Sequence, residues 1–260
     1  MRAMFTAATG MDAQTQRIDT IANNLANANT TGFKKSQVDF TDLMYAAVRR
    51  PGGNQTSNTH TPTGLEIGTG VTPASTLKIF TPGTIHNTDG ELDVAINGHG
   101  FFQVETHTGE IRYTRDGNLR MDSEGTLVTS KGNPIYPRMT LPTDSEAISI
   151  GADGTVTVQT PGDDPSQVGT IELARFTNPA GLSSEGGNLL AETMASGAPT
   201  TGTPGNDGLG ELQQGYLEGS NVEEVNELVD LISAQRTYEL NSRVVRAGDR
   251  VMQAANQIVA

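Results

Sequence analysis

Two apolar stripes with seven-residue spacing, one at each end of the chain, restrict what this sequence can fold into more than any other feature. Apolar residues at the a and d positions of a heptad form one face of a helix, and that face must be buried against a partner. The stripes therefore predict two terminal helices that pair as a coiled-coil-like domain. We expect this helix seam to contain Met4, Met11, Ile18, Ile21 and Leu25 of the first helix and Leu231, Tyr238, Val245, Met252 and Val259 of the second.

Both predicted helices have recognisable ends. The first pattern stops in the run Asn-Ala-Asn-Thr-Thr-Gly at residues 27–32, where Asn and Gly suit the left-handed backbone that ends a helix. Ser220 followed by Glu223 matches a capping box, which predicts that the second helix starts at Ser220. Such a helix would be about 60 Å long and would need a partner for its stripe. Its extra apolar row would face outward, at Val244, Val251 and Ile258.

The middle of the chain has the pattern of short strands. Alternating apolar residues at 92–96 and an apolar run at 101–104 flank Asn97-Gly98, the strongest short signal for a β-hairpin. Further strand-like runs lie at residues 111–114, 126–129, 148–150, 155–158 and 171–176, between Asp-Gly and Glu-Gly pairs. The fold class is therefore α+β and mainly β, with terminal helices, a central all-β domain and extended linkers.

Charge and composition divide the chain further. Residues 51–63 carry no hydrophobic side chain and residues 196–210 are rich in Gly, Pro and Thr, so both read as linkers that stay disordered unless a neighbour fixes them. We expect a terminal helical domain from residues 1–45 and 216–260, and an extended insert with a connecting β segment at 46–90. The central β domain would span 91–195, and a linker at 196–215 would return the chain to the helices.

Several classes of function are excluded by composition. The net charge of −13 argues against nucleic acid and against anionic membrane surfaces. Cys is absent, which rules out disulfides, zinc sites that contain Cys, and thiol catalysis. No apolar run is long enough to span a bilayer, and the N-terminus lacks the apolar core of a secretory signal. We expect a chain without membrane insertion that is either cytoplasmic or exported with its N-terminus intact.

The sequence contains no convincing catalytic or metal site. The four histidines lack the spacing of metal ligands. Asp116-Gly117-Asn118 starts like a calcium loop, but Arg120 and Met121 stand where the next ligand and the glycine belong. Carboxylates are abundant, and those at Asp-Gly pairs are typical of turns. We therefore expect no catalytic residue, no metal, no cofactor and no enzymatic activity.

The two stripes suggest self-assembly. Paired within one molecule, the helices bury a single seam, and the outward row of the second helix still needs a cover. A head-to-tail contact with the next copy would cover it, and head-to-tail contacts that do not close generate helical filaments. The residues alone thus favour a structural subunit that forms a homo-oligomer, with helices inside and the acidic β domain outside.

Particular segments resemble the bacterial flagellar rod and hook family. The N-terminal signature is IANNLANANTTGFKKSQVDFTDLMY at residues 21–45, in which we single out Asn23, Asn24, Asn27, Gly32 and Phe33. LDVAINGHGFFQV at 92–104 and YTRDGNLRMDSEGTLVTSKGNPI at 113–135 are similar to that family's central β domain. LEGSNVEEVNELVDLISAQRTYELNSRVV at 217–245 is similar to its C-terminal helix. The matches cover both ends and the centre, in order.

Within that family the chain most resembles rod proteins of the distal part. Residues 46–71 are similar to an insertion that the distal rod carries and that is associated there with rod straightness; Pro51, Gly52, Gly53 and Pro62 lie in it. The resemblance implies a subunit of a hollow drive shaft that crosses the periplasm and transmits torque to the hook. It implies as partners proximal rod proteins, hook protein, the proteins of the peptidoglycan and outer-membrane rings, and the flagellar type III export apparatus, which exports such subunits without a cleaved signal.

Other functions remain open at this stage. Within the family, the chain could be a proximal rod or a hook subunit. In a different class, it could be a monomeric secreted β protein that binds polysaccharide, although it has no Trp and only five Tyr and seven Phe. An enzyme that acts on peptidoglycan is the third possibility.

Overall fold

The computed structural model describes residues 2–49, 54–56, 59–60, 63–162 and 164–259, and within these the chain forms two compact units. The helical unit contains residues 1–25, 36–77 and 223–260. The β unit contains residues 26–35 and 78–222.

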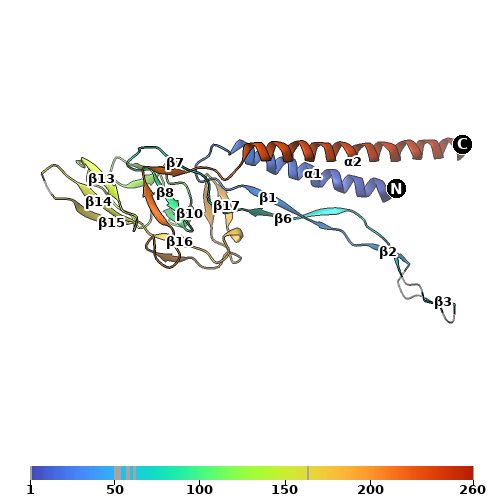
Figure 1. The fold of residues 1–260 in the computed structure, drawn as a ribbon, viewed down its shortest axis with the longest axis horizontal. Helices are drawn as coiled ribbons and strands as arrows, with labels where there is room; N and C mark the ends of the chain where they lie inside the picture. Colours follow the sequence, from blue (N-terminus) through green and yellow to red (C-terminus); the bar gives the residue numbers. More distant parts are fainter. Residues whose placement is uncertain (1, 50–53, 57–58, 61–62, 163, 260) are drawn as a thin grey trace. The chain divides into compact units, whose positions relative to one another are not determined.

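The helical unit is built on two antiparallel helices, α1 (Arg2–Ala26) and α2 (Glu224–Val259). They lie side by side, with the N- and C-terminal ends of the chain at the same end of the pair (Figure 1). The guanidinium of Arg17 lies 3.1 Å from the carboxylate of Asp230, and the amide of Asn24 donates to Glu227 at 3.2 Å. The predicted fold class, paired terminal helices with a central β region, is confirmed. Neither helix in the described part of the chain is long and apolar enough to cross a membrane.

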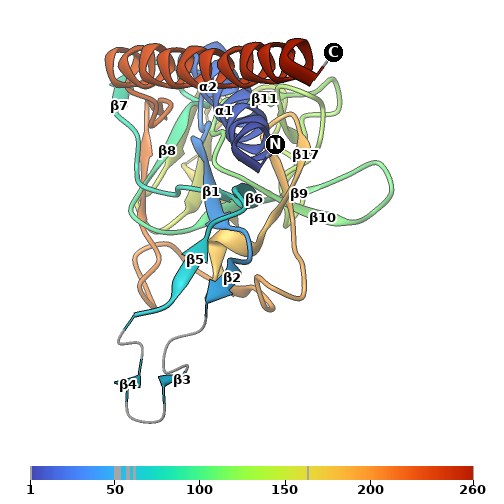
Figure 2. The ribbon, with the colours of Figure 1, turned by 90° about the vertical axis from the view of Figure 1, so that its right-hand side faces the viewer.

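A long two-stranded ribbon completes the helical unit. Its first strand begins at Ser36 and its last strand ends at Lys78. Its antiparallel pairs are β1 (Ser36–Asp42) with β6 (Val71–Lys78), β2 (Ala46–Arg49) with β5 (Leu65–Ile67), and β3 (Asn54–Thr56) with β4 (Thr59–His60). The strands β1, β2, β5 and β6 follow one another along it (Figure 2). The stretch 51–63, expected as a linker, thus contains the paired strands β3 and β4.

The β unit consists of several small antiparallel sheets. The largest has the order β17-β18-β10-β9-β16-β19: β17 (Ser183–Gly186), β18 (Leu189–Ala191), β10 (Ile111–Thr114), β9 (Phe101–Glu105), β16 (Leu173–Arg175) and β19 (Thr200–Gly202). A three-stranded sheet joins β13 (Ala147–Ile150), β14 (Thr155–Gln159) and β15 (Ser166–Thr170). Three pairs complete the unit: β11 (Leu119–Met121) with β12 (Leu127–Thr129), β8 (Val94–Asn97) with β20 (Glu211–Gln214), and β7 (Ile85–Asn87) with β21 (Tyr216–Glu218). A 3-10 turn lies at Pro179–Gly181.

The core of the molecule lies in the β unit. A main cluster contains Phe102, Leu127, Ile171 and Leu173, each almost fully buried. A second cluster is aromatic, and in it the rings of Tyr113 and Phe176 meet edge to face at 4.7 Å. Because alternate residues of β9 point to opposite faces of the sheet, Phe102 enters the main cluster and Phe101 the aromatic one. This is how a chain of short strands builds two cores around one sheet.

The expected hairpin at Asn97-Gly98 is wrong. β8 pairs with β20, and β9 pairs with β10 and β16, so the two flanking strands lie in different sheets. The backbone of Gly98 has φ +124° and lies so close to Gly210 that a Cβ would be 2.8 Å from its Cα. The residues between β8 and β9 therefore turn the chain from one sheet into another.

Two other expectations differ from the structure. Helix α2 begins at Glu224, not at Ser220, because the Ser220 hydroxyl accepts the amide of Val222 at 3.3 Å within the preceding turn. The expected linker at 196–215 supplies β19 and β20, and it buries Ser196, Leu209 and Leu212. Its abundance of Gly and Pro serves tight turns between paired strands rather than flexibility.

Candidate functional site

The seam between α1 and α2 is built mostly from small and half-buried residues. Its buried apolar side chains include Ala7, Ile21 and Ala234. Met4, Met11, Ile18 and Leu25 are half-buried, as are Leu231 and Val245, so these predicted seam residues lie on or near the contact. Tyr238 and Met252 are more than one third exposed and are not enclosed by it, and the side chain of Val259 lies outside the description.

Glycine and polar groups shape this seam. A Cβ on Gly10 would stand 2.8 Å from the Nδ2 atom of Asn241, and a Cβ on Gly248 would stand 2.7 Å from Met4. Both glycines therefore allow the helices to approach closely. The Oε1 atom of Gln14, seven residues after Ala7, is buried without a hydrogen-bond partner in the described part of the chain. Small and polar contacts of this kind hold a register but bury little apolar area.

The outward face of α2 has the opposite character. Val225, Val229 and Val251 are 73%, 61% and 69% exposed, although such residues are usually inside. At 100° per residue, Val225 and Val229 lie on the side of α2 opposite Ala234, and Val251 lies on its flank. Val244 and Val251 were expected to face outward and do so; the side chain of Ile258 is not described. The further exposed apolar residues of α2 are Leu228, Ile232, Leu240 and Val244.

The signature residue Asn24 joins three segments of the helical unit. Its Nδ2 atom donates to the carbonyl of Ser36 at 2.9 Å, and its Oδ1 atom accepts the amide of Ser36 at 2.9 Å. The same Nδ2 also donates to Glu227 at 3.2 Å. A buried asparagine thus imitates a strand partner for the start of β1 and also contacts α2. A side-chain amide suits this position because it supplies both the donor and the acceptor that these contacts need.

The other signature residues lie just after α1. Gly32 has φ +66°, and a Cβ there would stand 2.6 Å from the backbone of Arg115, so the position accepts only glycine. The ring of Phe33 lies 5.3 Å below the ammonium of Lys78. The carbonyl of Asn27 accepts the amide of Thr30 in the turn that ends the helix. Asn23 is exposed on α1.

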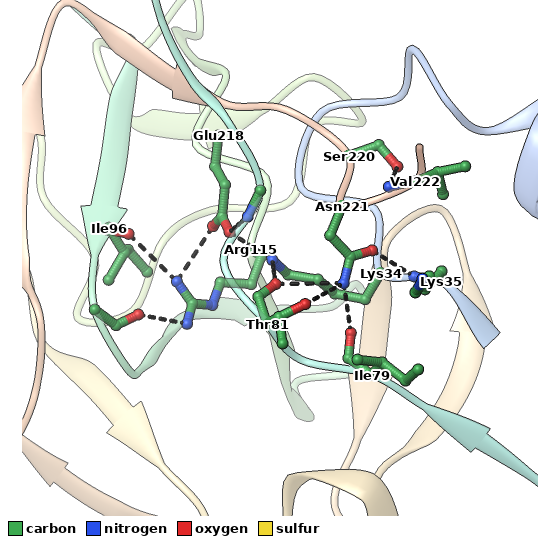
Figure 3. Close-up of polar contacts among 12 residues, drawn as sticks. Lys34, Lys35, Ile79, Thr81, Ile96, Arg115, Glu218, Ser220, Asn221 and Val222 are labelled. Carbon is green, nitrogen blue, oxygen red and sulfur yellow. Dashed lines mark hydrogen bonds and ion pairs between the residues drawn. The ribbon is translucent and has the colours of Figure 1, made fainter. Parts of the chain in front are cut away.

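A buried ionic cluster lies where the chain enters and leaves the β unit (Figure 3). The carboxylate of Glu218 accepts the ammonium of Lys34 at 2.5 Å, the guanidinium of Arg115 at 3.2 Å and the amide of Gly83 at 3.0 Å. All three charged side chains are at least 97% buried. Arg115 also donates to the carbonyl of Gly98 at 2.7 Å. One anion therefore joins three segments that are distant in the sequence.

Asn221 extends this cluster. Its Oδ1 atom accepts the amide of Lys35 at 2.7 Å, and its Nδ2 atom donates to the carbonyl of Ile79 at 2.8 Å. Burial lowers the pKa of Lys34, and it also lowers the pKa of Arg115, against the opposing effect of Glu218. The sequence reasoning missed this cluster. Lys34, Arg115 and Glu218 lie in three different segments, and their spacing in the sequence does not indicate that they meet in the fold.

The predicted insert is only partly described. Pro51, Gly52, Gly53 and Pro62 lie outside the described residues. Next to them, the ribbon exposes apolar side chains around the β2–β5 pair: Met44, Tyr45, Val48, Leu65 and Ile67. A two-stranded ribbon has no core of its own, so these side chains have no cover within it.

Groups that could perform chemistry do not converge. The described residues contain no cluster of His, Asp and Glu suited to a metal ion. His99 and His107 are exposed, and the ring of His86 shares a hydrogen bond with the hydroxyl of Thr84 at 2.9 Å. A hollow of about 490 Å³ in the β unit is lined mainly by Asn, Thr and Ser. Its carboxylate, Asp116, already accepts the hydroxyl of Thr31 and the amide of Asn118. No nucleophile with an adjacent base lines this hollow.

Three family models match the chain. Residues 4–34 match the flagella basal body rod protein family, residues 95–158 the D1 domain of the flagellar hook proteins FlgE, FlgF and FlgG, and residues 213–258 the C-terminal region of the flagellar basal body rod proteins FlgE, FlgF and FlgG. The first match contains the predicted seam of α1 and the signature residues. The third contains β21, the Glu218 site and most of α2.

Similar proteins match over almost the entire length. The flagellar basal-body rod protein FlgG of Buchnera aphidicola (subsp. Schizaphis graminum) is 46% identical over 98% of this chain and 99% of the relative. The FlgG protein of Caulobacter vibrioides is 43% identical over 99% of both chains. The flagellar hook-basal body complex protein FlhP of Bacillus subtilis is 32% identical over 99% of both chains. By this identity and coverage, the chain belongs to the FlgG family of flagellar basal-body rod proteins.

Proposed function

We propose that this chain forms the rod by polymerising with copies of itself through the apolar face of α2 that its own α1 leaves uncovered. As a member of the FlgG family it is a structural subunit of the distal rod of the flagellar basal body. It is not an enzyme, since the family is structural. The proposal concerns how the copies contact one another, and it rests on the two helices.

The observation that carries this proposal is the mismatch between the two faces of α2. The seam face is closed by Ala7 and Ala234, whereas Val225 and Val229 stand exposed on the opposite face and Val251 stands exposed on the flank of the helix. A monomeric protein rarely leaves a long apolar face in water, and such faces mark interaction sites. A second copy fits as the cover because the contact is then head to tail. Such a contact continues into a helical assembly instead of closing.

In this role the subunits stack into a hollow shaft that crosses the periplasm and carries torque to the hook. The partners are further copies of the chain, proximal rod proteins on one side and hook protein on the other. The proteins of the peptidoglycan and outer-membrane rings surround the shaft, and the flagellar type III apparatus exports the subunits. The acidic middle of the chain, with 19 Asp and Glu against seven Lys and Arg in residues 51–215, supports a hydrated outer surface.

The assembly surface is tested by placing a charge on it. Leu240→Asp and Val251→Asp change exposed residues, so the purified chain should keep its helix content. In the assembly they would bury a carboxylate, which costs several kcal/mol, and motility and rod formation should be lost. Thr143→Asp adds the same charge to an exposed loop of the β unit and should leave both unchanged. Normal rods that contain Val251→Asp would contradict the proposal.

The ribbon and its insert have a separate role in the proposal. Residues 51–63, with the exposed apolar side chains of β2 and β5 beside them, would bridge neighbouring subunits and keep the rod straight. Deletion of residues 51–63 should therefore yield rods that bend more easily in electron micrographs. Rods that stay as straight as those of the unchanged chain would contradict this role.

A further inference from the structure

The outward faces of the two helices carry opposite charges at the same spacing. Asp12 and Asp19 are exposed on α1 and lie seven residues apart. Arg236, Arg243 and Arg250 are exposed on α2, also at intervals of seven residues. Seven residues are nearly two helical turns, about 10.5 Å along the axis, so each set forms a row on one side of its helix. An acidic row and a basic row with equal repeats are complementary surfaces.

Helix α1 has three distinct sides, and the acidic row occupies the free one. One side contacts α2 through Ala7 and Ile21. A second side contacts the ribbon, where the hydroxyl of Thr9 accepts the amide of Val71 and Asn24 pairs with Ser36. The third side presents Asp12 and Asp19 together with Phe5, which is 71% exposed. Ala8 and Thr15 lie beside this row, and Gln16 and Asn23 are exposed on the same side.

The basic row of α2 lies within its outward apolar face. At 100° per residue, Arg236 and Arg243 project on the side of Val225 and Ile232, away from the seam. Within the described residues, none of the three arginines and neither of the two aspartates forms an ion pair; the ion pair of the helical unit joins Arg17 to Asp230. Glu239 is also exposed on this side, between Arg236 and Arg243, so the row keeps a net positive charge but is not purely basic. Arg246 adds a like charge four residues before Arg250, which costs the isolated helix stability. An acidic partner would reverse that cost.

One chain cannot bring its own two rows together. α1 and α2 contact each other through the seam, and both rows lie on the sides that face away from it. A second copy can do so, since its α1 offers the acidic row to the basic row of the first. We propose that the Asp12–Asp19 face of α1 in one copy docks on the Arg236–Arg243–Arg250 face of α2 in the next copy, with Phe5 packed against the outward valines. This inference rests on the self-assembly proposed above and adds which faces meet.

The contact is directional, because acidic α1 meets basic α2 and never its like. Each subunit therefore presents one acidic and one basic side, and every added copy leaves both kinds of side free at the ends. Like charges across the interface would reject the reversed arrangement. This is the geometry of an open helical polymer.

Charge reversal in two separate chains tests the contact. The first variant carries Asp12→Lys and Asp19→Lys, and the second carries Arg236→Glu, Arg243→Glu and Arg250→Glu. Each is produced as the full chain, alone and together with the other, in cells whose own copy has been deleted. Rods and motility are then measured. Arg120→Glu and Glu124→Lys, exposed on the β unit, are the matched controls.

Each variant alone should form rods at least about tenfold less well than the unchanged chain, since like charges then meet at every contact. The two variants together should restore rods in which both alternate, because each contact again joins unlike charges. Reversal of both rows within one chain should restore assembly as well. Equal assembly by the single variants, or no restoration by the mixture, would overturn the inference while leaving the proposed self-assembly intact. If the unchanged chain forms no rods, the proposed function itself fails.

The absence of Cys provides a second measurement. Asp12→Cys and Arg243→Cys, introduced together in one chain, should form disulfides between copies when rods are oxidised, and a ladder of oligomers should result. Asp12→Cys with Thr143→Cys should give no ladder. A monomer that remains unlinked in intact Asp12→Cys, Arg243→Cys rods would contradict the docking.

Discussion

The β unit and the helical unit bury their residues in opposite ways. The β unit encloses large side chains such as Phe102, Leu127 and Ile171, each at most 1% exposed, and it pairs its buried charges. The helical unit buries Ala7, Ala13, Ile21 and Ala234 and leaves larger residues of α2 in water. At about 25 cal/mol per Å² of buried apolar surface, the first arrangement sustains a fold by itself and the second gains little until further surface is covered. One chain thus combines a unit with a closed apolar core and a unit that leaves large apolar side chains exposed.

The largest effect is expected at the ionic cluster of the β unit. Glu218→Gln leaves Lys34 and Arg115 buried without their anion, which should lower the free energy of unfolding of this unit by about 3–5 kcal/mol. Urea unfolding followed by circular dichroism measures this. Glu211→Gln, exposed on β20, is the matched control and should be neutral. A neutral Glu218→Gln would show that the cluster does not stabilise the β unit.

Replacing one large buried side chain by Ala in each unit compares the two units directly. Leu127→Ala in the main β cluster should cost about 3–5 kcal/mol, because the dense surroundings cannot close the cavity. Ile21→Ala in the seam should cost about 2 kcal/mol, near the lower end for such changes, since a thin interface can collapse onto the gap. Both are measured as changes in unfolding free energy. Equal costs would remove the proposed contrast between a dense core and a thin seam.

The pH dependence of the free energy of unfolding tests the contribution of Lys34 to the cluster. Burial holds the pKa of Lys34 below its ordinary value of 10.5, so in the window between the folded pKa and 10.5 the unfolded chain binds more protons. The contribution of this group to stability is therefore complete above pH 10.5 and is lost as the pH falls through the folded pKa. Lys34→Met should abolish that dependence. It should also cost much less at neutral pH than Glu218→Gln, because Arg115 still pairs with Glu218. Unfolding curves of both proteins across alkaline pH provide the measurement.

The smallest effect is expected at the close approach of the helices. Gly248→Ala gains about 1 kcal/mol in helix propensity. It also places a Cβ 2.7 Å from the Cγ atom of Met4, a flexible side chain that can move. The helix content of the purified chain should thus change little, as measured by thermal melting. A loss as large as that of Ile21→Ala would show that the seam is packed as rigidly as the β core.

Much of the architecture was predictable because local patterns fix it. The strands at 111–114 and 155–158 were predicted from alternation and appear as β10 and β14. The hairpin at Asn97-Gly98 failed because the partner of β8 is β20, more than 100 residues away, and no local pattern contains that pairing. The start of α2 failed because the Ser220 hydroxyl bonds within a turn instead of capping the helix.

Part of the candidate site was likewise predictable from local patterns, and part of it was not. The heptads placed Leu231 and Val245 on the seam side of α2, where both are half-buried, but Tyr238 is more exposed than its position in the row implied. Asn24 was singled out through resemblance alone, whereas Gly32 was also expected to adopt left-handed backbone after the first helix, and its φ is +66°. The two hydrogen bonds of Asn24 to Ser36 and the close approach of Gly32 to the backbone of Arg115 became visible only in three dimensions.

By itself, the sequence determined the two terminal helices, the β-rich middle and membership of the rod family, since periodicity and motif order are properties of the chain read in one dimension. Only the tertiary structure decided which strands pair and how Glu218 gathers Lys34 and Arg115 into one buried cluster. The physical reason is separation along the chain. Helix periodicity depends on neighbours three and four residues away, whereas a buried charge network depends on segments that meet only after the whole unit has folded.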